Sequence, residues 1–313
     1  KNRTKRGVLE LDLPQRQIHV NDDGVVKGVS IRQRFDSHKL IEEFMIAANV
    51  AAAETLERQK QPCMYRIHNE PTLDKLEALR QFLDGIGINL AKGQKIEPNQ
   101  FNKILEKVAD TPNANMVNSV VLRSQSQAEY SPNNIGHFGL ALNHYCHFTS
   151  PIRRYSDLLV HRALIEGGKL GEGNLGAKFG DFKNIGEHLS DTERRAAQAE
   201  RDAVDRFSAA FLADRVGAEF TARVNGVTRF GLFITLDETG ADGLIPIRDL
   251  PDDYYIHDEA NHTLRGRRQG KEFRLGQSLR VVLAEANPMT GGMIFLLSEP
   301  DAKQTRKSLP SGK

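Results

Sequence analysis

The sequence has few cysteines, no long apolar run and almost no net charge. Its two cysteines, Cys63 and Cys146, lie far apart and lack the spacing of a metal site, which favours a reducing compartment. The longest apolar run, residues 44–53, is interrupted by Asn49 and predicts a buried helix, since a membrane span needs about 18 apolar residues. The basic opening, residues 1–6, is unlike a signal peptide. We therefore expect a cytoplasmic protein without a membrane segment.

Charge and composition leave a nucleic-acid partner open. A net charge of +2 is too small to indicate one, but residues 261–280 hold six basic residues and one acidic residue. Such a run either forms a solvated loop or follows a phosphate backbone, and charge alone does not separate the two. A hydrophobic content of 39% in 313 residues is sufficient for two domains with separate cores.

Apolar residues at helical spacing dominate residues 1–215 and predict an α-rich domain with a minor β component. Alternating residues before the turn at residues 22–24 predict strands near the start of the chain. Ser190 and Glu193 form a possible capping box, so the last helix is expected to begin at residue 181 or 190. Helices are expected over residues 36 or 37–59, 72–83, 98–109, 113–123, 150–165 and 181 or 190–215.

Short strands replace the helices after residue 215. Five of them in roughly 80 residues, with one long connection, predict an OB-type β-barrel over residues 216–300. The expected strands cover residues 218–226, 229–236, 242–247, 279–285 and 292–298. Residues 301–313 are predicted to be a basic disordered tail, and the fold class is α+β.

The segment HFTSPIRRYSDL, residues 147–158, has the features of a helix start. Ser150 suits the N-cap and Pro151 the first helical position, which places Arg153 and Arg154 in the first turn. Two arginines there oppose the helix macrodipole, and with the free N–H groups they would bind an anion such as a phosphodiester. The alternative is that Arg153 pairs with Asp157 and only stabilises the helix.

The longer run GHFGLALNHYCHFTSPIRRYSDLLVHR, residues 136–162, resembles the signature of the ribonuclease II/ribonuclease R catalytic (RNB) domain. The resemblance includes residues 37–43 and extends from about residue 7 to 300, and the ribonuclease R branch fits best. It implies hydrolytic, processive 3′→5′ degradation of RNA to nucleoside 5′-monophosphates. Arg153 then corresponds to the catalytic arginine on the scissile phosphate, and Glu42 to a glutamate near the RNA backbone. Further RNA contacts are implied for Ser150, Thr149, Arg154 and Tyr155.

One departure from the family concerns the metal. Family members use two Mg²⁺ ions held by clustered aspartates upstream of this signature, and no such cluster opens this chain. The pairs Asp22–Asp23 and Asp252–Asp253 are expected to be turn acids. The Mg²⁺ ligands are therefore expected in the missing N-terminal half of the same protein, and this chain alone is expected to bind RNA without cleaving it.

A second resemblance lies in ARVNGVTRFGLFI, residues 222–234, followed by DGLIP, residues 242–246, which are similar to an S1 RNA-binding domain. In that family, exposed rings stack on the bases of single-stranded RNA, which implies this role for Phe230 and Phe233. Arg223 and Arg229 could contact phosphates. Pro246 replaces a histidine common in the motif, and the basic run falls in the barrel insertion.

Two alternatives remain open. His144, His147 and His161 lack the spacing of a metal site and are expected to be structural or adjacent to RNA. The whole chain could also be a non-catalytic, S1-containing RNA clamp or adaptor, which would explain the missing aspartates. Against that reading, a pure binder has little need for the arginine signature.

Overall fold

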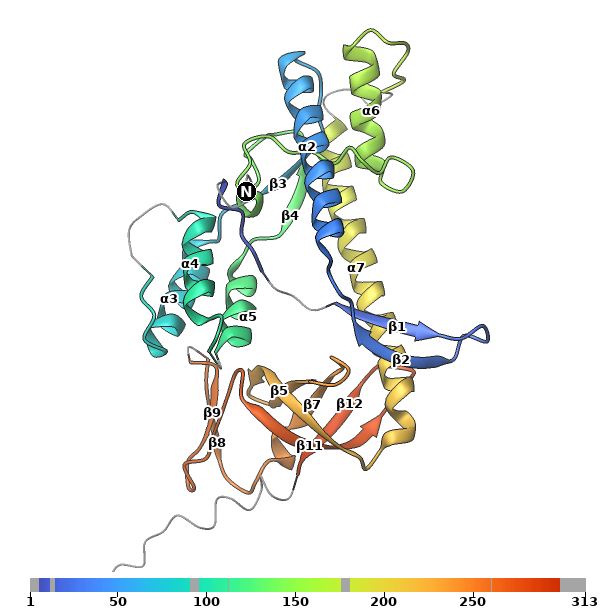
Figure 1. Cartoon of the computed structure of the whole chain (residues 1–313). Helices are drawn as coiled ribbons and strands as arrows, with labels where there is room; N and C mark the ends of the chain where they lie inside the picture. Colours follow the sequence, from blue (N-terminus) through green and yellow to red (C-terminus); the bar gives the residue numbers. More distant parts are fainter. Residues whose placement is uncertain are drawn as a thin grey trace, which may run out of the picture.

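The computed structural model describes residues 6–11, 15–90, 96–111, 113–175, 181–259 and 261–298. It confirms the α+β class, with an α-rich region followed by a closed five-stranded barrel (Figure 1). The long helix α7 (Phe182–Leu212) runs from the far end of the α-rich region down to the barrel (Figure 1). The other helices are α2 (Asp36–Arg58), α3 (Leu73–Gly85), α4 (Pro98–Val108), α5 (Ala114–Ser124) and α6 (Tyr155–Gly167).

Two small antiparallel sheets accompany these helices. One pairs β1 (Arg16–Val20) with β2 (Val26–Ile31), and the predicted turn at residues 22–24 joins them. The other pairs β3 (Tyr65–His68) with β4 (Ala128–Ser131), and Tyr65 also bridges Cys146 of the signature segment. Strand β3 was not predicted, because four residues are too few for an alternating pattern.

The barrel strands lie where the sequence predicts them. Their order around the closed barrel is β11–β12–β7–β6–β5, and a separate sheet in the order β10–β9–β8 is inserted between β7 and β11. The barrel strands are β5 (Glu219–Thr228), β6 (Gly231–Leu236), β7 (Asp242–Pro246), β11 (Ser278–Ala286) and β12 (Met293–Leu297); the inserted strands are β8 (Tyr255–Asp258), β9 (Thr263–Gly266) and β10 (Glu272–Arg274). The predicted tail, residues 301–313, lies outside the described residues.

One predicted helix start is wrong, and of the two starts predicted for the last helix, residue 181 is confirmed and residue 190 is wrong. Helix α6 begins at Tyr155, with Arg154 at the N-cap, so Ser150 and Pro151 precede the helix in a separate turn. Helix α7 begins at Phe182, and Ser190 is buried inside it, where its hydroxyl accepts the Tyr130 N–H at 3.0 Å. The capping box was wrong because tertiary contacts use these polar side chains.

The predicted burial of the apolar run in α2 is also wrong for its first half. Buried residues begin at Asn49, whereas the Phe44 side chain is 63% exposed. The C-terminal half of α2 packs on α6, and the N-terminal half leaves an apolar surface uncovered. No described helix combines the length and apolar character needed to cross a membrane.

The barrel and the α-rich region share one hydrophobic core. A single cluster contains Leu79 of α3, Val117 of α5, Leu212 of α7 and Phe295 of the barrel. Polar contacts reinforce the junction: the Arg16 guanidinium bridges Asp205 of α7 at 2.9 Å and Asp242 of β7 at 3.3 Å. The barrel therefore has a fixed place against the helices.

Substitution of Gly231, at the start of β6, should destabilise the barrel. Its φ of +149° is rare for other residues, and an added Cβ would lie 2.2 Å from the Ile245 carbonyl oxygen. We expect Gly231→Ala to lower the free energy of unfolding by about 3 kcal/mol through strain and overpacking. Denaturant unfolding and hydrogen exchange of residues 219–247 would measure this. Gly28→Ala, where an added Cβ meets no atom within 4 Å, is the control, and equal stability of both variants would contradict the account.

Candidate nucleic-acid interface

A buried carboxylate organises the turn before α6. Asp157 is completely buried, and its Oδ1 atom accepts hydrogen bonds from the Ser150 N–H and the Arg154 guanidinium, both at 2.8 Å. The Ser156 hydroxyl donates to Oδ2 at 3.0 Å. The N–H groups of Arg153 and Arg154 bond back to the Ser150 carbonyl, which closes the turn. One side chain thus fixes the path of the backbone from Ser150 into the helix.

The two arginines of the signature have different environments. Arg154, not Arg153, forms the ion pair with Asp157, so the expected alternative pairing of Arg153 is wrong. The Arg153 side chain is exposed, and its guanidinium makes no hydrogen bond or ion pair with any residue that the structure describes. An exposed guanidinium on a fixed backbone, without a partner among the described residues, is suited to bind an anion.

Other parts of the turn also have unused polar groups. Thr149 Oγ1 and Arg154 Nε are buried without a hydrogen-bond partner among the described residues, and such atoms are costly unless a partner arrives. The Tyr155 ring is 47% exposed beside them. The turn therefore places Thr149, Ser150, Arg153, Arg154 and Tyr155 side by side before and at the start of α6.

An aromatic and basic cluster lies behind this turn. His147 Nδ1 hydrogen-bonds to the Tyr130 hydroxyl at 2.9 Å, and the Arg66 guanidinium lies 4.6 Å from the Tyr130 ring centre. Arg66 also donates to Glu193 of α7 at 2.6 Å. Burial, followed by the charge of nearby Arg154, lowers the pKa of His147 to about 3. His147 is thus neutral at physiological pH.

Two other histidines of the signature are engaged with protein groups. His144 pairs with Glu57 at 2.6 Å, and His161 stacks on Phe148 with 4.3 Å between ring centres. His161 also hydrogen-bonds to the Phe148 carbonyl at 2.9 Å. Within the described ranges, no three His, Cys, Asp or Glu side chains are grouped so that they could hold a metal ion.

Glu42 lies on the surface of α2, in a different part of the chain from the turn before α6. Its carboxylate pairs with Arg34 rather than with Lys39, which pairs with Asp36. Glu42 lies seven positions before Asn49, the first buried residue of the helix. The two residues are therefore about 10 Å apart along the helix axis.

Asn49 is a positioning residue that the sequence analysis did not identify. Its side chain accepts the Phe148 N–H at 2.9 Å and donates to the Tyr145 hydroxyl at 3.0 Å. These bonds fix the signature segment to α2. The only signal in the sequence is one polar residue inside an apolar run.

The barrel presents a second set of predicted residues. Phe230 and Phe233 are 59% and 37% exposed, with ring centres 5.9 Å apart in an edge-to-face arrangement. Arg229 is exposed, whereas Arg223 is half-buried and donates to the Gly276 carbonyl at 3.4 Å. Arg223 also lines a cavity of about 410 Å³ with Asp242, whose pKa is raised by burial.

The two sets of residues are far apart. Helix α6 and the barrel lie toward opposite ends of α7 (Figure 1). The 31 residues of α7 span about 46 Å at about 1.5 Å per residue. A ligand that touches both sets must be a long polymer.

Removal of the buried carboxylate should destabilise the fold strongly. We expect Asp157→Ala to cost about 3 kcal/mol, because it leaves Arg154 and the Ser150 N–H without their acceptor. Asp191→Ala is the matched control, since its side chain is 75% exposed and 3.7 Å from Arg194. That change should cost less than about 0.5 kcal/mol. Urea unfolding followed by circular dichroism would compare them, and equal losses would show that Asp157 is not an anchor.

Comparisons with known proteins agree with this arrangement. The RNB domain model matches residues 1–167, and the S1 RNA binding domain model matches residues 213–298. Ribonuclease R of Aquifex aeolicus is 40% identical over 90% of this chain, and that of Escherichia coli is 38% identical over 92%. The chain spans only 40% and 36% of the lengths of these relatives.

The structure gives the same result. Apo Mycoplasma genitalium RNase R matches with a TM-score of 0.88 and 29% identity, over 95% of this chain and 47% of that one. The same enzyme in complex with ribose-methylated single-stranded RNA matches equally well. The resemblance found in the sequence is thus confirmed: the chain belongs to the RNB family and is ribonuclease R-like.

Proposed function

We propose that this chain is part of a 3′→5′ exoribonuclease that hydrolyses RNA processively to nucleoside 5′-monophosphates. The observation that carries the proposal is the exposed Arg153 guanidinium, which has no partner among the described residues and follows a turn fixed by Asp157. In that position Arg153 binds the scissile phosphate and stabilises the charge that develops there. Ser150, Thr149, Arg154 and Tyr155 contact the adjoining RNA, and Glu42 lies near its backbone.

The barrel guides single-stranded RNA toward this site. The exposed rings of Phe230 and Phe233 can each stack on a base, an interaction worth about 1–3 kcal/mol. Arg223 and Arg229 contact phosphates. Support comes from the matched RNase R structure that contains single-stranded RNA.

The metal requires residues outside the described part of this chain. RNB nucleases generally depend on divalent metals, and hard cations require clustered carboxylates, which the described residues do not supply. We assign the ligands of Mg²⁺ to the N-terminal half of the same protein, which would act in a cytoplasmic complex with this part. The nuclease portion is residues 1–215 and the S1 domain is residues 216–300.

An uncovered apolar surface supports that partner. Phe35, Leu40, Ile41 and Phe44 at the start of α2 are each between 55% and 63% exposed. Contiguous exposed apolar side chains are typical of an interface. The N-terminal half would cover this surface and so place its carboxylates beside α2.

A non-catalytic RNA clamp or adaptor is the second candidate. The lack of a metal-binding group among the described residues favours it. Both candidates bind RNA, and only the first releases nucleotides when the missing half is supplied.

Cleavage by the reconstituted protein tests the proposal. With 3′-labelled single-stranded RNA and Mg²⁺, the chain alone should bind RNA without cleavage, and addition of the N-terminal half should release labelled mononucleotides. Arg153→Ala should slow release by about 100-fold or more, because one donor to the reacting group is lost.

The control for this experiment is Arg195→Ala, which changes an exposed arginine of α7 and should leave the rate unchanged. If the reconstituted protein binds RNA but leaves it intact, the exoribonuclease proposal is contradicted and the function is that of an RNA clamp. If the Arg153→Ala variant cleaves RNA at the wild-type rate, Arg153 has no role in the mechanism.

A further inference from the structure

The sheet inserted in the barrel has one packed face and one open face. Tyr255, Leu264 and Phe273 are buried and belong to the shared core. Because side chains alternate along strands, the residues between them point the other way. These strands were not predicted, since each is only three or four residues long.

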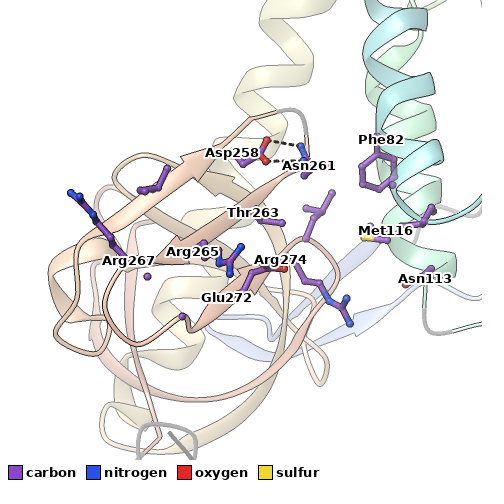
Figure 2. Close-up of a pocket in the computed structure, with 16 residues that line it drawn as sticks. Phe82, Asn113, Met116, Asp258, Asn261, Thr263, Arg265, Arg267, Glu272 and Arg274 are labelled. Atoms are coloured by element: carbon purple, nitrogen blue, oxygen red, sulfur yellow. Dashed lines mark hydrogen bonds between the residues drawn. The ribbon is translucent and has the colours of Figure 1, made fainter.

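The open face lines a groove of about 1000 Å³. Its other wall comes from α3 and α5, and Figure 2 shows Arg265 and Arg274 on the sheet, with Phe82 and Met116 on the helices across the groove. On this face the strand register aligns the side chains in two rows that run across the three strands. One row contains Ile256, Arg265 and Glu272, and the other contains Asp258, Thr263 and Arg274.

Three arginines and two acids line the groove, which leaves an excess of one positive charge. Arg265, Arg267 and Arg274 line it, and their guanidinium groups make no hydrogen bond or ion pair with the described residues. Of the two acids in the groove, Asp258 accepts two hydrogen bonds from Asn261, at 3.1 and 2.7 Å, and Glu272 lies opposite Arg265. The free charge is therefore suited to an anionic polymer.

The groove continues toward the RNA-binding residues proposed on the barrel. Met116 and Leu275 line both this groove and the cavity that contains Arg223. A chain that lies in the groove can therefore reach Arg223 without leaving the protein surface.

We infer that this groove binds the backbone of single-stranded RNA, as a surface separate from the Phe230–Phe233 pair. The inference rests on the proposed RNA-binding function and adds a second contact region to it. Arg265 of β9 and Arg274 of β10 are diagonal neighbours on the open face, about 7–8 Å apart, which suits neighbouring phosphates of an extended chain. Phe82 is only 4% exposed, so the groove offers no ring for stacking, and binding there is electrostatic and independent of sequence.

Charge reversal in the groove tests this inference. Binding of fluorescent 20-nucleotide oligouridine to the full chain would be measured by anisotropy between 50 and 200 mM KCl. We expect Arg265→Glu with Arg274→Glu to weaken binding about tenfold or more. Two lost phosphate contacts should also reduce the slope of log K against log salt by about 1.4, which is 2 × 0.7.

Matched controls separate charge from folding. Lys103→Glu with Lys107→Glu reverses two exposed charges on α4, outside the groove, and should change affinity less than twofold. Arg265→Gln with Arg274→Gln removes the same charges without adding repulsion and should also reduce the salt slope. Thermal unfolding of each variant verifies that the fold is intact.

The outcomes distinguish the inference from the proposed function. If the wild type binds RNA normally and both groove variants keep its affinity and salt slope, only the inference about the groove is overturned. Loss of binding to polyglutamate but not to RNA would assign the groove to an acidic protein and also overturn the inference. Failure of the wild-type chain to bind RNA would overturn both.

Discussion

The arrangement of the signature segment depends on the carboxylate of Asp157. It is completely buried, and it neutralises Arg154 while it accepts the Ser150 N–H. A buried charge is tolerated only with such partners, so the turn cannot relax without a large cost in free energy. Because Arg154 satisfies Asp157, Arg153 is left exposed and available. The ion pair of Arg154 is therefore structural, whereas the neighbouring Arg153 faces solvent.

Helix α7 connects this turn with the RNA-binding barrel. In the first half of α7, Glu193 pairs with Arg66, whose guanidinium lies over the Tyr130 ring. Near its end, Asp205 holds Arg16, which also contacts the barrel. The same helix thus has one polar anchor in each half and fixes the distance between the turn and the barrel. A polymer that contacts both the turn and the barrel is therefore held at two points a fixed distance apart.

Much of the fold could be predicted because its signals are local. Caps and periodicity located most helices, and alternation with turn residues located the five barrel strands. The start of α6 could not be found, because Asp157 draws Ser150 into a turn through a tertiary contact. Strands β3 and β8–β10 depend on partners rather than on their own short sequences. The groove was beyond prediction for the same reason, since its walls are about 150 residues apart in the chain.

The polarity of bound RNA tests the central claim most directly. An oligonucleotide with 4-thiouridine either at its 3′ end or about ten nucleotides upstream would be photo-crosslinked to the protein reconstituted with its N-terminal half, and crosslinked peptides would be identified by mass spectrometry. The account predicts that the 3′-terminal nucleotide crosslinks within residues 149–155 and the upstream nucleotide within the barrel. A 3′ end found at the barrel, or none at residues 149–155, would contradict it.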